Sequence, residues 1–299
     1  MLDRLQYAPL AVLVRLVGVL PRPVARGFGI LLGQLTYYLY PRLRRVGRRN
    51  LQIAFPEKSD AERRKILKGV YTSLGRLLAE FCLFPYYTVR NSSQVAVYQG
   101  FENFEAAERR GLGVLLLTAH FGGWEVGSFF HSLQGHPIRI VVRPLDNPYA
   151  DAMVTYYRTL HGNTVVNKQD FARGLLHAMR KNETVGVLMD TNMTPPQGVF
   201  VPFFGIPACT ASGVARVALH TGAAVVPAFT IWDPKLGKYR VQFDPALELV
   251  NTGDHDADAT ANTALFNRVL EGYIRKYPDQ WLWVHRRWKT RPAGDPPLY

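Results

Sequence analysis

The sequence predicts an α/β fold: a mostly parallel, twisted sheet with helices on both faces, preceded by N-terminal membrane-associated helices. From Gly113 onward, short apolar runs of strand-like character alternate with helical patterns. Strands joined by helices form parallel sheets that are covered on both faces. Ahead of this alternation lie two long apolar segments edged by arginine. A chain of 299 residues with 47% hydrophobic content can bury the core that such a sheet needs.

Residues 1–50 are expected to form a helical, membrane-anchoring region, and residues 51–299 an α/β domain. The first 60 residues carry ten Lys or Arg and three Asp or Glu, and they are also the most apolar part of the chain. Their apolar runs, 8–20 and 27–40, are shorter than the ~18 residues of a clean membrane span. Apolar helices edged by arginine suit a membrane surface with anionic headgroups. A helical pair packed on the domain and a single tilted span are the alternatives.

Each expected element follows from a local pattern. Pro23 stands near the first turn of a helix, where its missing N–H is tolerated. Ser59 and Glu62 have the spacing of a capping box, which predicts a helix start there. Before residue 100 we expect helices at about 2–20, 23–40, 42–53 and 59–81. Beyond it we expect strands at 113–118, 138–142, 184–189 and 224–231, and helices at 124–133, 148–160, 171–181, 210–220 and 258–277.

Composition limits the partners and the chemistry. The 36 Lys and Arg exceed the 23 Asp and Glu by 13, which predicts an anionic partner: nucleic acid, anionic lipid or an acidic carrier protein. Cys82 and Cys209 stand far apart in apolar surroundings, which indicates buried thiols of a reducing compartment and not a disulfide. His120, Glu125 and His131 do not have the spacing of a metal motif, and no GxSxG elbow occurs. We therefore expect no metal and no cofactor.

The most informative segment runs from an apolar strand through His120 and the pair Gly122-Gly123 to Glu125. On one regular helix, residues five apart point about 140° away from each other. If His120 ends the strand and the glycines bend the backbone, Glu125 falls in the first turn of the next helix and can reach the imidazole. A carboxylate on one ring nitrogen leaves the other nitrogen as a general base. The alternative is a surface histidine beside an acid that only complements the helix dipole.

Two further charged residues, Arg143 and Asp190, directly follow expected strands. Open α/β sheets bind their ligands at the carboxyl ends of the strands. There Arg143 can hold a phosphate or a developing oxyanion, or it can pair structurally with Asp146 or Asp190. Asp190 in turn can hold Arg143 or His120 in place, bind a substrate hydroxyl, or cap its own turn. Both residues are therefore candidate site residues.

The segment Trp281–Lys289 alternates aromatic and basic residues. Such interleaving occurs in nucleic-acid-binding proteins and also at membrane interfaces. Because no nucleic-acid-binding motif accompanies it, we expect no nucleic-acid partner.

Several motifs occur in order along nearly all of the chain. They are Asn50-Leu51 with Ala54-Phe55-Pro56, His120-Phe121-Gly122-Gly123-Trp124-Glu125, Arg143-Pro144-Leu145-Asp146-Asn147-Pro148, Met189-Asp190, Gly198–Gly205, Pro207–Thr210 and Trp281–Lys289. In this ordered set the chain resembles the late acyltransferases of lipid A biosynthesis, the lauroyl/myristoyl transferase family within the glycerolipid acyltransferase superfamily. Much of that superfamily has Asp where this chain and the lipid A branch have Glu. Thr191-Asn192 also departs from the Gln-Asp that often follows Met-Asp in that branch.

The resemblance implies a membrane-associated O-acyltransferase at the cytoplasmic face of the bacterial inner membrane. A fatty acyl group would pass directly from an acyl thioester, on an acyl carrier protein, to a hydroxyl of a lipid A precursor, with no metal. In this interpretation His120 is the general base, Glu125 orients it, and Arg143 binds an acceptor phosphate or assists the oxyanion. Asp190 is the other polar residue expected to bind substrate.

In this family the segment Val199–Gly205 lies close to the active site, so Phe200, Phe203 and Phe204 are expected to wall a dry cleft for the fatty chain. A core strand and turn is the alternative for these aromatic residues. Two other functions stay open. One is an acyltransferase that acts on another glycolipid or on a lysophospholipid, and the other is a non-catalytic protein that binds anionic membranes.

Overall fold

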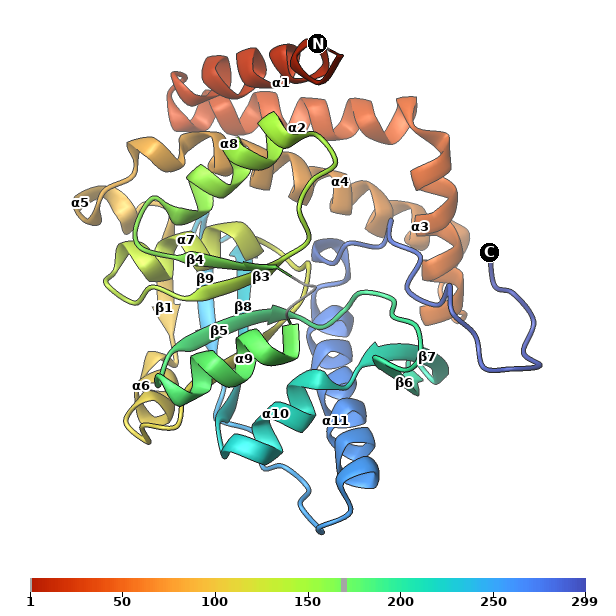
Figure 1. Ribbon diagram of the computed structural model, residues 1–299. Helices are drawn as coiled ribbons and strands as arrows, with labels where there is room; N and C mark the ends of the chain where they lie inside the picture. The colour runs from red at the N-terminus through yellow and green to blue at the C-terminus, as the bar shows by residue number, and fades with distance from the viewer. Residues whose placement is uncertain (1, 168–170) are drawn as a thin grey trace.

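The computed structural model describes residues 2–167 and 171–299, and one sheet forms the centre of this part of the chain (Figure 1). The sheet strands are β1 (Ala96–Gln99), β2 (Val114–Thr118), β3 (Arg139–Val142), β4 (Thr164–Asn167), β5 (Thr184–Leu188), β8 (Ala224–Asp233) and β9 (Lys238–Phe243). They lie in the order β1-β9-β8-β2-β5-β3-β4. All neighbouring pairs are parallel except β8 and β9, which form an antiparallel hairpin. The mostly parallel sheet expected from the sequence is therefore confirmed.

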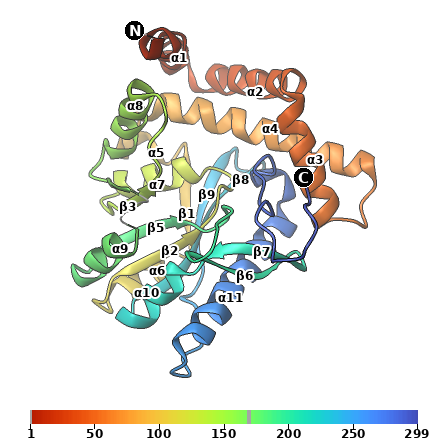
Figure 2. The same ribbon diagram turned by 45° about the vertical axis from the view of Figure 1, so that its right-hand side comes forward.

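Helices cover both faces of this sheet (Figures 1 and 2). The helices of the body are α4 (Asp60–Leu83), α5 (Val89–Ser92), α6 (Phe101–Glu108), α7 (Trp124–Leu133), α8 (Pro148–Thr159), α9 (Phe171–Arg180), α10 (Gly213–Thr221) and α11 (His255–Lys276). On one face lie α6 and α7, with α4 and α8 packed against α7. On the other lie α9, α10 and α11, beside a small antiparallel hairpin of β6 (Gly198–Phe203) and β7 (Ile206–Ala211).

The central strand β2 shows how the two layers of core arise. Leu115 and Leu117 belong to the apolar cluster that includes side chains of α9, α10 and α11. Val114 and Leu116 belong to the second cluster, which includes side chains of α4, α6 and α7. Successive strand side chains point to opposite faces, and both faces of β2 are buried. A strand in that position needs a continuous apolar run, which is the pattern in the sequence.

The N-terminal helices α1 (Leu2–Gly18), α2 (Arg22–Leu39) and α3 (Pro41–Ala54) form an outer layer over α4 (Figure 1). Helix α2 approaches α4 closely, because a Cβ atom on Gly29 would lie 2.3 Å from the carbonyl oxygen of Gly75. The buried carboxylate of Glu80 on α4 accepts hydrogen bonds from Arg22 and Arg26 of α2. In the described residues, no helix is both long enough and apolar enough to span a membrane.

The four expected strands correspond to β2, β3, β5 and β8, and the capping box of Ser59 and Glu62 is present at the start of α4. The helix expected at 210–220 begins only at Gly213, because β7 continues to Ala211. The sequence analysis also missed β1, β4 and β9. They lie at the two ends of the sheet; β9 carries polar residues between its buried ones, and β1 has a single buried residue, Ala96.

Candidate active site

The site is built where two neighbouring parallel strands end. Thr118 of β2 lies opposite Leu188 of β5 in the strand register. His120 and Asp190 each lie two residues further on, so they come side by side. His120 Nδ1 lies 2.9 Å from Asp190 Oδ1, and the backbone N–H of His120 donates to Asp190 Oδ2 at 2.9 Å. Of the roles considered for Asp190, the structure shows that it holds His120.

The carboxylate of Asp190 is 3% exposed and has a third donor, the indole N–H of Trp281, at 2.8 Å from Oδ2. Burial alone would raise the pKa of this carboxyl. The imidazole of His120 and the hydrogen bonds from His120 and Trp281 outweigh that effect and lower the pKa of Asp190 to about 2. The group is therefore an anion at any physiological pH.

His120 has an environment that favours its protonated form. Burial lowers the pKa of the imidazole, but the charge and hydrogen bond of Asp190, joined by the charge of Glu125, raise it above its ordinary value, while Arg158 acts in the opposite direction. About a quarter of the side chain is exposed. Because Nδ1 faces Asp190, Nε2 is the nitrogen left for a substrate.

The structure corrects the expected partner of His120, which is Asp190 and not Glu125. Glu125 does lie in the first turn of α7, as expected after Gly122-Gly123. Its carboxylate pairs with the guanidinium of Arg158 on α8, which donates from Nε at 3.0 Å and from Nη2. The two side chains are 13% and 22% exposed. An Arg–carboxylate fork of this kind fixes both groups, and Glu125 affects His120 through its charge.

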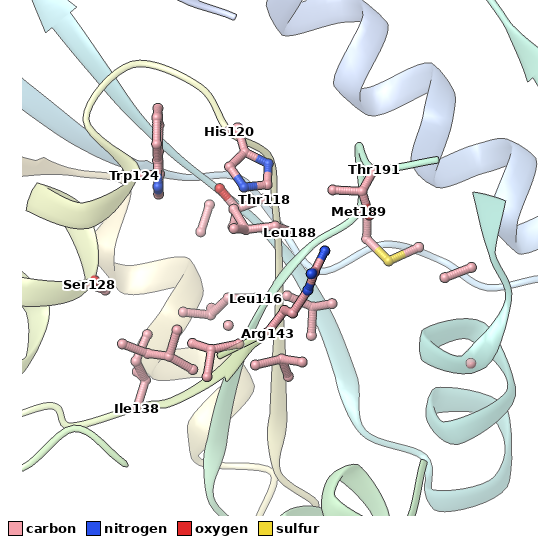
Figure 3. A pocket seen from close by; sticks show the side chains of 18 of the residues that line it. Leu116, Thr118, His120, Trp124, Ser128, Ile138, Arg143, Leu188, Met189 and Thr191 are labelled. Atoms are coloured by element: carbon pink, nitrogen blue, oxygen red, sulfur yellow. The ribbon is translucent and has the colours of Figure 1, made fainter. Parts of the chain in front are cut away.

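A cavity of about 790 Å³ opens at His120 (Figure 3). In Figure 3, His120, Trp124 and Thr191 lie at one end, and Ile138 lies at the other. The inner part, between α7 and the sheet, is lined by apolar or small residues: Leu116, Gly127, Ser128, Ile138, Ile140, Gly186 and Ala228. His131, whose pKa burial lowers to about 3, also lines it and is therefore neutral. The cavity thus combines a polar opening with a largely apolar interior.

The absence of a side chain at Gly186 leaves part of the space in the inner cavity. Gly186 lies opposite Leu116 of β2 and Ile140 of β3, so all three positions share one face of the sheet. A glycine inside a strand often marks a place where a ligand comes close. The ladder between β3 and β5 ends at Ile140 and Gly186, and Val142 and Leu188 beyond it line the cavity.

Arg143 lies at the mouth of the same cavity, directly after β3 (Figure 3). Its side chain is 78% exposed and pairs with Asp146, Nη2 to Oδ1 at 3.2 Å. An exposed ion pair of this kind contributes little to stability, so it leaves the guanidinium available to a ligand. Arg216 and His285 line the cavity as well.

The structure does not place Phe200, Phe203 and Phe204 in the cavity wall. Phe203 and Phe204 are buried, with ring centroids 5.6 Å from Trp281 for Phe203 and 5.9 Å from Trp283 for Phe204. Phe200 on β6 lies opposite Cys209 on β7. The hairpin therefore supports the C-terminal segment behind Asp190, while aliphatic residues of β2 and β3 line the apolar interior.

Sequence reasoning missed Arg158, the role of Trp281, and the small residues that open the interior. Arg158 has no local signal, because its partner lies on another helix. Trp281 belongs to a recognised motif, but its contact with Asp190 spans 91 residues. Among the described residues, no three or more His, Cys, Asp or Glu side chains converge in a way that could hold a metal ion.

Comparison with known proteins agrees with the resemblance seen in the motifs. The model of the bacterial lipid A biosynthesis acyltransferase family matches residues 2–290. The Escherichia coli K12 lipid A biosynthesis lauroyltransferase is 32% identical over 290 residues, which cover 95% of this chain and 91% of that protein. The palmitoleoyltransferase of the same organism is 27% identical, with 94% and 90% covered, and its myristoyltransferase is 24% identical, with 82% and 75% covered. The chain is an acyltransferase and belongs to the bacterial lipid A biosynthesis acyltransferase family.

Proposed function

We propose that this protein transfers a fatty acyl group from an acyl carrier protein thioester to a hydroxyl of a lipid A precursor, with His120 as general base. The observation that carries the proposal is the position of His120. Its Nδ1 is held by the anionic Asp190, and it stands at the opening of a cavity with an apolar interior. A fatty chain needs such an interior, and a hydroxyl needs a base beside it.

In the proposed reaction, Nε2 of His120 takes the proton of the acceptor hydroxyl while the hydroxyl oxygen attacks the thioester carbonyl carbon. The carbon–sulfur bond breaks, and the sulfur leaves with the proton that the imidazolium gives back. Asp190 stabilises the imidazolium, as the acid of a Ser-His-Asp triad does. Both substrates react while bound together, so no acyl-enzyme forms.

The charged groups around the cavity take the remaining roles. Arg143, exposed at the mouth, binds a phosphate of the acceptor or assists the oxyanion, because a guanidinium matches phosphate oxygens with two hydrogen bonds. Glu125 stabilises the imidazolium by its charge, and Arg158 fixes Glu125. The family membership and the lipid A names of the relatives support this choice of acceptor.

We further propose that residues 1–50 attach the protein to the cytoplasmic face of the bacterial inner membrane, beside the 51–299 domain. Large apolar side chains of α1 to α3, and of the turn between α1 and α2, are exposed: Leu5, Val12, Leu16, Val19, Val24, Phe28, Leu31, Leu35, Leu39 and Leu43. Arginines of the same helices can contact anionic headgroups. This arrangement supports helices that lie in the membrane surface.

A transfer assay tests the function. Purified protein in detergent, given an acyl carrier protein thioester and a lipid A precursor, is expected to add one acyl group, as detected by mass spectrometry of the lipid. A lysophospholipid offered as acceptor should gain none. Acylation of the lysophospholipid alone would contradict the lipid A precursor as acceptor and favour a lysophospholipid acyltransferase. Thioester consumption in neither reaction would favour a non-catalytic membrane-binding protein.

The donor and the membrane surface have separate tests. Since the net charge is +13, kcat/KM for the acidic carrier protein thioester should fall more steeply with salt than that for a coenzyme A thioester. Equal salt slopes would contradict a carrier-protein surface.

Leu31→Glu with Leu35→Glu should release the protein from anionic vesicles, whereas Leu236→Glu, at an exposed site on the β8–β9 turn, should not. Unchanged vesicle binding by the double variant would rule out α2 as the attachment face.

A further inference from the structure

The segment around Trp281 is joined to the backbone of the His120 turn. Leu282 donates its N–H to the carbonyl of His120 at 3.0 Å, and Gly122 donates its N–H to the carbonyl of Gln280 at 2.7 Å. Phe121 and Trp281 form an isolated antiparallel bridge between these bonds. The C-terminal segment therefore lies along residues 120–122 like a short added strand.

Trp281 itself is held on several sides. It is buried, and its ring packs against Trp283 at a centroid distance of 4.5 Å and against Phe203 at 5.6 Å. Asn50 on α3 is fully buried and donates to the carbonyls of Trp283 and His285, which fixes the segment that follows. An indole held this firmly presents its N–H in one direction.

That direction is Asp190. Oδ2 of Asp190 accepts from the Trp281 indole at 2.8 Å and from the His120 backbone at 2.9 Å, while Oδ1 faces His120 Nδ1. Two donors on one oxygen leave the other oxygen for the imidazole. Without the indole N–H, a buried lone pair would lose its partner, and the carboxylate would have one constraint fewer on its rotation.

We propose that Trp281 is a positioning residue of the acyl transfer reaction: its indole N–H holds the Asp190 carboxylate in the orientation that fixes the tautomer and plane of His120. This inference rests on the proposed role of His120 as general base. Trp281 acts through Asp190 and needs no contact with substrate. The C-terminal segment is therefore part of the catalytic assembly.

The charged groups that face His120 predict how its pKa changes when the indole N–H of Trp281 is removed. They are Asp190 after β5, Glu125 on α7 and Arg158 on α8, with the buried Arg287 near Asp190. A donor on Asp190 Oδ2 draws charge away from Oδ1. Removing that donor concentrates charge on the oxygen that faces the imidazole, and the pKa of His120 rises further. Removing the carboxylate charge, as in Asp190→Asn, has the opposite effect.

The experiment compares Trp281→Phe with Trp283→Phe. Both variants lose an indole N–H in the same buried segment, but Trp283 donates to the carbonyl of Pro278 and not to Asp190. In Trp281→Phe, kcat should fall at least about tenfold with KM nearly unchanged, since hydrogen bonds to charged groups are among the stronger ones. The acid limb of the pH–rate profile should move to higher pH. Trp283→Phe should leave that limb in place.

An NMR titration of ¹⁵N-labelled histidine separates this inference from the proposed function, because it measures the His120 pKa without turnover. A higher His120 pKa in Trp281→Phe supports the positioning role even if the acceptor is another lipid. An unchanged or lower pKa overturns it, although wild-type acyl transfer would still stand. If Trp281→Phe unfolds, replacing Trp281 with benzothienylalanine removes only the N–H from the same ring shape, and the same titration decides.

Discussion

Two regions of the molecule present a carboxylate near His120, and they differ in what surrounds it. At the end of β5, Asp190 is buried and accepts hydrogen bonds from His120 and Trp281. In the first turn of α7, Glu125 is partly exposed and its oxygens are occupied by Arg158. The nearer residue in sequence is thus neutralised by an arginine, whereas the distant one contacts the imidazole. Strand register, and not the five-residue spacing between His120 and Glu125, decides which acid touches the histidine.

The largest expected effect comes from removing the group that both carboxylates serve. His120→Ala should lower kcat by about 10²–10⁴-fold, the usual contribution of a general base, and its thermal unfolding should stay close to wild type. His220→Ala on the exposed end of α10 is the matched control and should keep full activity. More than about a tenth of wild-type kcat in His120→Ala would exclude the histidine as the base.

Neutralising Asp190 and Glu125 one at a time should show which carboxylate has the larger effect on His120. Asp190 raises the pKa of His120 more than Glu125 does, so Asp190→Asn should shift the acid limb of the pH–rate profile downward further than Glu125→Gln. The sign follows because activity needs neutral His120, and a lower pKa keeps it neutral to lower pH. Asp190→Asn should also cost more in kcat at neutral pH, since the imidazole loses its anionic partner. A larger downward shift in Glu125→Gln would reverse the comparison.

The pair on α7 and α8 should show coupling in stability. Glu125→Ala or Arg158→Ala alone leaves a partly buried charge without its partner, so each should lower the free energy of unfolding. The double variant should recover part of the loss, with a coupling of about 1–3 kcal/mol in denaturant unfolding. Additive losses would mean that the fork seen between these side chains contributes nothing in solution.

Substitutions of Gly186, which lines the inner part of the cavity, should have the smallest effect on the rate but a clear effect on acyl-chain specificity. A methyl group on Gly186 would meet the tip of the Ile138 side chain at 3.2 Å and the carbonyl oxygen of Arg139 at 4.0 Å, so the fold should accept Gly186→Ala and Gly186→Val. Both should shift the preference toward shorter acyl donors, by about 0.8 kcal/mol for each methylene excluded. Gly272→Ala on α11, where an added methyl has open space, should leave the preference unchanged. Identical chain-length profiles for wild type and Gly186→Val would place the acyl chain elsewhere.

These regions also separate what the sequence predicts from what it does not. The apolar runs of β2, β5 and β8 identified the central strands, and the glycine turn placed His120 and Glu125 correctly on a strand end and a helix start. Asp190 was one of two acids that the sequence offered as a partner of His120, but the choice between Asp190 and Glu125 depends on which strands are neighbours and on their register. The Phe200–Phe204 segment was misplaced for a related reason: aromatic composition is the same for a core hairpin and a lipid cleft. The roles of Gly186 and Arg158 could not be predicted either, because they depend on residues of other strands and helices that the fold brings near.

The bond between Trp281 and Asp190 has a consequence for how the protein is made. Every strand of the central sheet precedes Trp281 in the chain, so the ribosome can complete and release the whole sheet before the indole emerges. During that interval the nascent chain holds His120 and Asp190 but lacks the indole N–H that Asp190 accepts. If Trp281 has the proposed positioning role, full activity therefore requires this segment to dock on the His120 turn.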